Sequence, residues 1–460
     1  MITMPELNYA QLIQQQKSYF LTGETKTIAF RRKQLKKLRD AVLRNEELIY
    51  EALYKDLHKS KFEAYATEIG FVLEELTYHI KHVKKWAKPK RVRTPLTSFP
   101  ASSYQTCDPK GNVLIMAPWN YPFQLTLVPL IGAVSAGNTA VIKPSEISIH
   151  TAQVIEKIIS ETFDEKYLQV IIGGAKEAQE LLQQDFDHIF FTGSGRIGRI
   201  VLESAASRLI PVTLELGGKS PCIVDEDVHV KLTARRIIWG KLINAGQTCI
   251  APNCLIVHEK IKDKLLPELV NAIKKFYGEN IQTNKEYPRI INRANMERLI
   301  GMMEGSKVYW GGRYDVEELF FEPTIIDEAC LNLPVMQSEI FGPILPVLTY
   351  ENMEELIRKL RECPNPLALY YFSNNKENIR KILNVIPAGG VTINDTLMHF
   401  ANNSLPFGGT RNSGMGKYHG KHSFDVFSNE KPVVYRGTWL DIPIRYAPFR
   451  NKIKIIKKLM

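Results

Sequence analysis

A cysteine within a short polar stretch is the first residue whose chemistry suggests a nucleophile. Cys249 stands in Asn244-Ala-Gly-Gln-Thr-Cys249, after a helix-like run over residues 232–242 and before a strand-like run over residues 254–257. A turn between such elements leaves a thiol partly accessible, and an accessible thiolate attacks electrophilic carbon. The alternative is a half-buried cysteine without a role, because buried inert thiols are common. Other residues of the chain must decide between these interpretations.

A glutamate inside an apolar run is the second candidate. Glu215 stands in Leu214-Glu-Leu-Gly-Gly-Lys219, and burial would raise the pKa of its carboxyl toward that of a general base. It also follows a glycine-rich loop at roughly the twenty-residue distance at which dinucleotide-binding folds place the acid that holds a ribose. An ion pair with Lys219 is a third interpretation. The residues by themselves leave all three open.

The glycine-rich loop is Phe191-Thr-Gly-Ser-Gly-Arg-Ile-Gly198, which matches G-x-G-x-x-G between a strand-like and a helix-like segment. Glycine lets the backbone N–H groups at a helix N-terminus approach a phosphate closely. The pattern favours a nucleotide site over an ordinary strand-to-helix turn, which is the alternative. The residues assigned to that site are Thr192, Gly193, Ser194 and Gly198.

Polar residues after two further apolar runs extend this set. Asn120 lies between Trp119 and Tyr121, where its amide could donate to a developing oxyanion or simply form a turn. Lys143 and Glu146 directly follow a strand-like run, at the position where open α/β sheets place ligand contacts. The expected site therefore involves the ends of several strands.

Apolar periodicity predicts the elements that must position these residues. Helical spacing dominates residues 6–88, and residues 125–142 indicate a buried helix, a Gly-Asn turn and a buried strand rather than a membrane span. Strand-like and helix-like runs then alternate, which predicts a parallel sheet covered by helices on both faces. The expected strands are 111–117, 139–142, 168–172, 188–192 and 211–216. A second α/β unit is expected over residues 217–394.

Length and composition exclude several classes of protein. With 460 residues the chain exceeds a single core, so two or three domains are expected. Six scattered cysteines and a polar, charged beginning predict a reduced, cytoplasmic protein. Cys249 and Cys254 lack the second ligand pair of a zinc site, so no metal is predicted.

The net charge of +11 is distributed unevenly, with basic clusters at residues 79–93 and 445–458. Neither cluster has the aromatic pattern of a nucleic-acid module, so no nucleic-acid partner is predicted. Both are expected to be solvated faces, with contact to an anionic membrane surface as the alternative. The final dozen residues could lie on such a surface as a basic amphipathic helix, pack against a partner subunit or be disordered.

Seven motifs, in order along the chain, resemble those of the aldehyde dehydrogenase superfamily. They are Pro118-Trp-Asn-Tyr-Pro122, Lys143-Pro-Ser-Glu146, Phe191-Thr-Gly-Ser194, Leu214-Glu-Leu-Gly-Gly-Lys219, Gly246-Gln-Thr-Cys249, Glu339-Ile-Phe-Gly-Pro343 and Pro406-Phe-Gly-Gly409. The resemblance covers the chain from about residue 10 to 435. The short N-terminus and Ser413-Gly-Met-Gly-Lys-Tyr-His419 resemble the class 3 and fatty aldehyde dehydrogenase branch.

The resemblance implies a role for each candidate. Cys249 corresponds to the nucleophile, Glu215 to the general base and Asn120 to the oxyanion donor, which decides the competition over Glu215. Cofactor contacts are implied for Trp119, Lys143, Glu146, Thr192, Gly193, Ser194, Gly198, Glu339 and Phe341. The substrate-pocket candidates, which could equally be core residues, are Tyr121, Trp239 and His419. Arg196 occupies a position that varies in the family, so no contact is assigned to it.

The implied fold is α/β, with a Rossmann-like cofactor domain, an α/β catalytic domain and a small β-rich bridging segment. The cofactor domain is expected over residues 1–83 and 108–213, and the catalytic domain over residues 214–394. The bridging segment is expected over residues 84–107 and 395–435, followed by a basic tail over residues 436–460. Resemblance to class 3 implies a homodimer built through the bridging segment.

The implied activity is NAD(P)-dependent oxidation of an aldehyde to the carboxylic acid through a cysteine thiohemiacetal and thioester. NAD is expected over NADP, and the substrate is expected to be an apolar, medium- or long-chain aliphatic or aromatic aldehyde. One alternative is an acylating enzyme that passes the thioester to coenzyme A or phosphate. Others are a non-catalytic, lens-type relative and a membrane-surface binding protein that depends on the basic tail.

Overall fold

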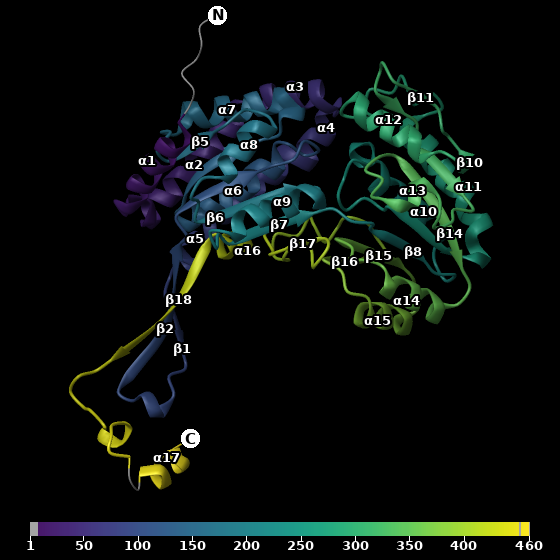
Figure 1. The fold of residues 1–460 in the computed structure, drawn as a ribbon. Coiled ribbons are helices and arrows are strands. Elements are labelled where there is room, and N and C mark those ends of the chain that lie inside the picture. The colour runs from purple at the N-terminus through teal and green to yellow at the C-terminus, as the bar shows by residue number, and fades with distance from the viewer. Residues whose placement is uncertain (1–7, 450–451, 460) are drawn as a thin grey trace, which may run out of the picture.

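The computed structural model describes residues 8–449 and 452–459, which include two large sheets and a long arm (Figure 1). The first sheet has the strand order β17-β7-β6-β3-β4-β5, and every neighbouring pair is parallel except β17 with β7. Its strands are β3 (Asn112–Met116), β4 (Thr139–Lys143), β5 (Leu168–Val170), β6 (His188–Gly193), β7 (Val212–Leu216) and β17 (Gly414–Met415). The predicted parallel sheet is confirmed.

Successive side chains of a strand point to opposite faces of a sheet. Because the buried strands here are apolar on both faces, helices cover both of them. Three helices lie on one face, α1 (Tyr9–Leu21), α8 (Ala175–Leu182) and α9 (Gly195–Ala206), and they pack with Leu114 and Phe191 of the strands. Val113 and Phe190 point to the other face and its larger core. Helices of that core are α2 (Ile28–Arg44), α3 (Glu46–Leu57), α5 (Gly70–Trp86), α6 (Gln124–Ala136) and α7 (Ile149–Thr162).

The apolar run over residues 125–142 folds as expected. All residues of α6 are buried, and Gly137 ends the helix in a left-handed conformation with φ 96°. β4 then begins at Thr139 and is buried throughout. A left-handed residue at a helix end favours glycine, which explains why the chain can turn directly from α6 into the sheet.

The second sheet has the order β10-β13-β14-β9-β8-β15-β16 and is parallel except where β10 meets β13. Its strands are β8 (Pro221–Val224), β9 (Cys254–His258), β10 (Lys307–Trp310), β13 (Thr324–Asp327), β14 (Ile344–Tyr350), β15 (Ala368–Phe372) and β16 (Gly390–Ile393). The helices of this part are α10 (Val230–Leu242), α11 (Glu259–Tyr277), α12 (Arg293–Met302), α13 (Pro334–Gln337), α14 (Met353–Glu362) and α15 (Lys376–Val385).

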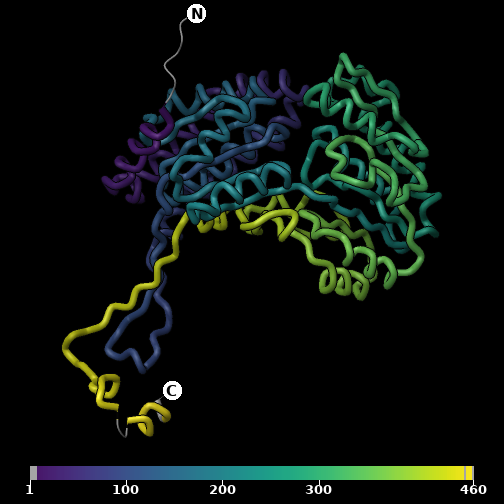
Figure 2. The backbone as a smooth tube through the Cα atoms, viewed as in Figure 1, coloured from purple at the N-terminus to yellow at the C-terminus, as the bar shows by residue number. Residues whose placement is uncertain are grey.

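The arm is a three-stranded sheet of β1 (Lys90–Val92), β2 (Ala101–Pro109) and β18 (Ser428–Arg436). β18 runs antiparallel to β2 from Ser428 opposite Pro109 to Arg436 opposite Ala101. Figure 2 shows these segments, far apart in sequence, side by side as they leave the body of the molecule. Short connecting elements elsewhere are η1 (Glu24–Lys26), α4 (Lys61–Ala64), η2 (Tyr65–Ile69), η3 (Leu96–Ser98), η4 (Glu146–Ser148), η5 (Ile243–Gly246), β11 (Tyr314–Asp315), β12 (Phe320–Phe321) and α16 (Lys421–Val426).

The tail beyond the arm forms η6 (Pro443–Arg445) and the short helix α17 (Ile453–Leu459). Part of the predicted amphipathic helix is thus helical, while residues 450, 451 and 460 lie outside the described residues. Over the described ranges, no helix is both long and apolar enough to cross a bilayer.

Three of the expected domain boundaries fall inside observed strands, and those between residues 107 and 108 and between residues 435 and 436 lie in β2 and β18. The boundary between residues 213 and 214 falls inside β7, a strand of the first sheet. Within the expected bridging segment, β17 pairs with β7, and Gly414 lies opposite Glu215. The C-terminal part of the chain therefore completes the sheet edge beside the predicted general base.

Candidate active site

The turn that carries Cys249 has an unusual backbone. After α10 the residues Asn244, Ala245 and Gly246 all have positive φ, at 52°, 49° and 74°. A Cβ on Gly246 would lie only 2.3 Å from the carbonyl oxygen of Gly342, so the position excludes a side chain. Asparagine and glycine tolerate left-handed backbone better than other residues, which explains the composition of the motif. The turn ends with the Cys249 thiol half-buried and free.

Side-chain amides join this turn to the loop that carries Asn120. Asn120 Nδ2 donates to the carbonyl oxygen of Gln247 at 3.0 Å, and Asn244 Nδ2 donates to the carbonyl oxygen of Asn120 at 2.7 Å. Because a carboxamide nitrogen carries two hydrogens, Asn120 keeps one N–H for a further acceptor. Its buried position and reciprocal bonds hold that donor in a constant relation to the nucleophile turn.

The surroundings of Cys249 disfavour its thiolate. Burial and the negative charges of Glu339 and Glu215 raise the pKa of the thiol, while the backbone N–H groups of Cys249 and Ile250 oppose the shift. The thiol is therefore neutral near pH 7 in this arrangement. A cation or a proton acceptor that enters the cavity would favour the reactive form.

Glu215 lies in β7 and is only 3% exposed. Neither carboxylate oxygen accepts a hydrogen bond of good geometry from the described residues. Burial raises its pKa well above the usual range, and Lys417 and the backbone N–H of Gly409 offset this only in part. Lys219 instead donates to the carbonyl oxygen of Met336, so the ion pair between Lys219 and Glu215 is absent. A buried, unpartnered carboxyl with a raised pKa is suited to general-base work.

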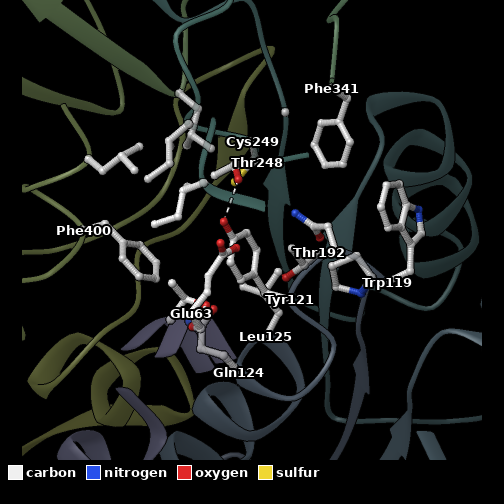
Figure 3. Close-up of a pocket in the computed structure, with 18 of the residues that line it drawn as sticks. Glu63, Trp119, Tyr121, Gln124, Leu125, Thr192, Thr248, Cys249, Phe341 and Phe400 are labelled. Carbon is white, nitrogen blue, oxygen red and sulfur yellow. Dashed lines mark hydrogen bonds between the residues drawn. The ribbon is translucent and has the colours of Figure 1, made fainter. Parts of the chain in front are cut away.

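These groups face one cavity of about 1340 Å³ between the two large sheets (Figure 3). Predicted site residues on its wall are Trp119, Asn120, Tyr121, Thr192, Gly193, Ser194, Glu215, Trp239, Cys249, Glu339 and Phe341. Arg196, for which no contact was assigned, also lines it. The predicted residues that do not line it are Lys143, Glu146, Gly198 and His419.

Two of these residues do not line the cavity for a clear physical reason. Gly198 is buried against the sheet, where a Cβ would lie 2.7 Å from a methyl of Leu216, so it permits helix–strand packing rather than contact with a ligand. His419 is fully buried behind the wall and stacks on Phe407, with ring centroids 5.1 Å apart. The expectation that His419 lines the substrate pocket is therefore wrong, because rings in front of it form the surface.

Three buried charged residues beneath the Asn120 loop were not expected from the sequence. Lys59 Nζ donates to Glu68 at 2.5 Å and to the carbonyl oxygen of Asn120 at 3.1 Å. Glu63 Oε1 accepts the backbone N–H of Asn244 at 2.7 Å. Charged residues are usually solvated, so no sequence signal distinguished these three.

The first-sheet side of the cavity fits a dinucleotide. Ser194 caps α9, whose first turn contains no acidic residue, so its free N–H groups favour an anion. Thr192 Oγ1 and Glu339 Oε1 are buried without a hydrogen-bonding partner among the described residues. Lys143 lies nearby at the end of β4 and bonds Glu146 at 3.3 Å. Unpartnered polar atoms beside an anion-binding helix end are what a phosphate- and ribose-bearing ligand would satisfy.

The family model described as "Aldehyde dehydrogenase family" matches residues 6–433. The chain belongs to the aldehyde dehydrogenase family. The resemblance based on seven motifs is thus confirmed, and with it the enzyme class.

Similar proteins include class 3 aldehyde dehydrogenases, as predicted. The chain is 49% identical over 443 residues to 4,4'-diaponeurosporen-aldehyde dehydrogenase of Staphylococcus aureus, with 96% of each chain covered. It is 44% identical to aldehyde dehydrogenase family 3 member A2 of Pongo abelii, covering 91% of this chain and 86% of the relative. A substrate-bound structure of Staphylococcus aureus AldH has a TM-score of 0.97 at 47% identity, covering 98% of this chain and 99% of the other. The predicted fold class is confirmed.

Proposed function

We propose that this aldehyde dehydrogenase oxidises apolar, medium- or long-chain aldehydes to carboxylic acids with NAD or NADP. The observation that carries the proposal is the convergence of Cys249, Asn120 and Glu215 on one cavity whose other walls are mainly aromatic and aliphatic. Apolar residues on those walls are Phe62, Phe71, Leu125, Trp239, Ile243, Leu397, Met398, Phe400 and Phe407. Such a surface favours an apolar chain because it removes that chain from water.

The residues divide the reaction among them. Once the Cys249 thiol has lost its proton to a base that enters the cavity, its sulfur attacks the aldehyde carbon, and the free N–H of Asn120 and the backbone N–H of Cys249 donate to the oxyanion of the thiohemiacetal. A nicotinamide dinucleotide held beside Thr192, Ser194 and Glu339 would supply the hydride acceptor that conversion of this adduct to a thioester requires. Glu215 then removes a proton from water, whose oxygen attacks the thioester carbon. The carbon–sulfur bond breaks, which releases the carboxylic acid and the Cys249 thiolate.

The names of relatives agree with an apolar substrate. One relative is named for diaponeurosporen-aldehyde, and another belongs to aldehyde dehydrogenase family 3. The substrate-bound relative matches 98% of this chain at a TM-score of 0.97. Similarity at this level supports a comparable substrate class for the present cavity.

A chain-length series tests the proposed reaction. We expect NADH release to be faster with longer alkanals, measured as kcat/KM, and to need neither coenzyme A nor phosphate. In H₂¹⁸O the carboxylic acid should carry one ¹⁸O atom from water, because Glu215 and Cys249 line the same cavity. A requirement for coenzyme A or phosphate would show that the enzyme is acylating. Absence of NADH release with every aldehyde would favour a non-catalytic role.

Cofactor preference is expected to depend on Glu146. Its side chain is half exposed beside Lys143, and a carboxylate that accepts bonds from ribose hydroxyls repels a 2′-phosphate. We expect a higher kcat/KM with NAD than with NADP, and Glu146→Gln should narrow the difference by about tenfold or less, since exposed charges are screened. A clear preference for NADP in the unmodified enzyme would contradict the assignment. The comparison matters because one relative, from Canis lupus familiaris, is named dimeric and NADP-preferring.

A homodimer formed through the arm is part of the proposal. The strands of the arm expose Val434 and Tyr435, and the segment that follows exposes Trp439. Figure 1 shows that the arm sheet meets the main part of the molecule only at its base. Exposed aromatic and aliphatic side chains on a projecting sheet are typical of a surface that a second subunit covers.

The basic tail is proposed to give weak attachment to anionic membranes. In α17 the side chains of Ile453 and Ile455 are more than half exposed, and Lys454 and Lys457 are exposed beside them. Each basic residue near an anionic surface contributes about 1 kcal/mol. Deletion of the chain after Pro448 should reduce co-sedimentation with phosphatidylserine vesicles at low salt and raise KM for long alkanals more than for short ones.

The matched control for this deletion is the double variant Lys454→Gln/Lys457→Gln, which keeps the apolar residues. It should lose most of the salt-sensitive binding if charge provides the attachment. If the full-length and truncated proteins co-sediment equally with the vesicles, the proposed membrane attachment is wrong, and the proposed dehydrogenase function is unaffected.

A further inference from the structure

Two polar side chains on the cavity wall have no part in the reaction described above. Glu63 belongs to α4, and Gln124 begins α6. Both line the cavity, which Figure 3 shows together with Tyr121 and Phe400. Glu63 is 9% exposed and Gln124 is 1% exposed. A cavity with many apolar residues thus contains a carboxyl and a carboxamide that are almost completely removed from bulk water.

Each of these side chains has one polar atom without a partner. Glu63 Oε1 accepts the backbone N–H of Asn244 at 2.7 Å, whereas Oε2 accepts no hydrogen bond within the described residues. Gln124 Nε2 is buried and also lacks a partner in that part of the chain. Gln124 Nε2 is a buried donor without a partner, which is rare in proteins, and Glu63 Oε2 on the same cavity wall is an acceptor that the described residues leave free. Together they point to a ligand.

The charge of Glu63 is not neutralised by a direct bond. Lys59, the nearby cation, bonds Glu68 at 2.5 Å, and Glu68 Oε2 accepts the backbone N–H groups of Phe123 and Gln124. Burial raises the pKa of Glu63 to about 7, and the charge of Lys59 opposes this rise. Glu63 Oε2 can accept a hydrogen bond in either protonation state, and it repels an anion when it is ionised.

We propose that Glu63 and Gln124 form a polar subsite that binds a hydroxyl group on the chain of an aldehyde substrate. This rests on the proposed dehydrogenase function and narrows its substrate class to aldehydes with an apolar chain that bears a hydroxyl. A hydroxyl can donate to Glu63 Oε2 and can accept from Gln124 Nε2, whereas an alkyl chain satisfies neither atom. A carboxylate at the same place would be repelled by ionised Glu63.

The test compares straight-chain alkanals with ω-hydroxyalkanals of the same length, over a series of lengths. For each pair, the ratio of kcat/KM for the hydroxylated to the plain aldehyde is measured with NAD in the unmodified enzyme. The variants are Glu63→Gln, Glu63→Leu and Gln124→Leu, with Glu74→Gln, an exposed residue of α5, as the matched control.

At one or more lengths the ratio should fall about tenfold in Glu63→Leu, since a hydrogen bond to a charged group has that effect on an affinity. Gln124→Leu should also lower the ratio, and Glu74→Gln should leave it unchanged. Glu63→Gln keeps an acceptor for the Asn244 N–H but removes the charge, so its ratio should fall less than that of Glu63→Leu. Glu63→Gln should also oxidise ω-carboxyalkanals better than the unmodified enzyme does.

The ratio separates this role from a purely structural one. If Glu63 only positions the turn of Cys249, its loss lowers kcat for both aldehydes equally and leaves the ratio unchanged. If the ratio is the same in the unmodified enzyme and in every variant at all lengths, the proposed subsite is wrong. Glu63 Oε2 and Gln124 Nε2 then bind only water. Failure of the unmodified enzyme to oxidise any plain alkanal would instead contradict the dehydrogenase function. Should Glu63→Leu not fold, Glu63→Gln and Gln124→Leu give the same comparison.

Discussion

Replacing Cys249 by alanine should lower kcat by about 10⁴-fold or more, the usual effect of removing a covalent nucleophile. NAD binding, measured by fluorescence titration or calorimetry, should change little, because the predicted dinucleotide contacts lie mainly at the ends of the first-sheet strands. The left-handed turn from Asn244 to Gly246 precedes the substitution, so its backbone should be retained. The expected result is therefore an inactive enzyme that still binds its cofactor.

The control for this substitution is Cys254→Ala, which removes a neighbouring thiol. Cys254 is buried in β9 and does not line the cavity, so an aldehyde in the cavity does not reach its thiol. Cys254→Ala should keep most of the activity. Mass spectrometry of the unmodified enzyme with substrate should find acyl groups on Cys249, and acyl groups on Cys107 or Cys254 instead would refute the assignment.

Replacing Glu215 by glutamine should separate the two halves of the reaction. The amide has nearly the same shape as the carboxyl but cannot accept a proton from water, so hydrolysis of the thioester should slow by about 10²–10⁴-fold. If hydride transfer remains fast, rapid mixing should show a burst of NADH stoichiometric with active sites, followed by slow turnover. The removed negative charge should also lower the pKa of the Cys249 thiol, since Glu215 contributes to raising it.

Hydroxylamine provides the control for this variant. This small external nucleophile cleaves thioesters without a general base, so it should restore multiple turnovers in Glu215→Gln and yield the hydroxamate. It should have no such effect on Cys249→Ala, which forms no thioester. A variant Glu215→Gln that shows neither a burst nor hydroxylamine rescue would mean that Glu215 acts before thioester formation.

The family and the identities of the main candidates could be predicted from the sequence because they depend on local patterns. Alternating apolar runs predicted a parallel sheet with helices on both faces, since each strand of such a sheet buries both of its faces. The glycine loop after β6 indicated an anion-binding helix end, because that property belongs to the loop and helix themselves. Seven motifs in order then identified the family, which the family model confirms over residues 6–433.

Contacts between distant segments could not be predicted in this way. The pairing of Gly414 with Glu215 joins β17 to β7, although the two residues are far apart in the sequence, and it places a strand from the expected bridging segment in the first sheet. His419 was expected in the pocket as an aromatic residue, but the rings of Phe400 and Phe407 lie against it and form the wall. Gly198 fitted a phosphate-loop pattern, yet the close approach of Leu216 explains the glycine.

Sequence alone therefore determined the family, the layered α/β architecture and the three residues expected to carry the chemistry, because each has a local signature. Only the tertiary structure decided which charges are buried. Lys59, Glu63 and Glu68 carry charges that are usually solvated, and they are removed from water because the Asn120 loop and the Cys249 turn pack over them. Burial is a property of the segments that meet at a residue, which no pattern within one segment contains.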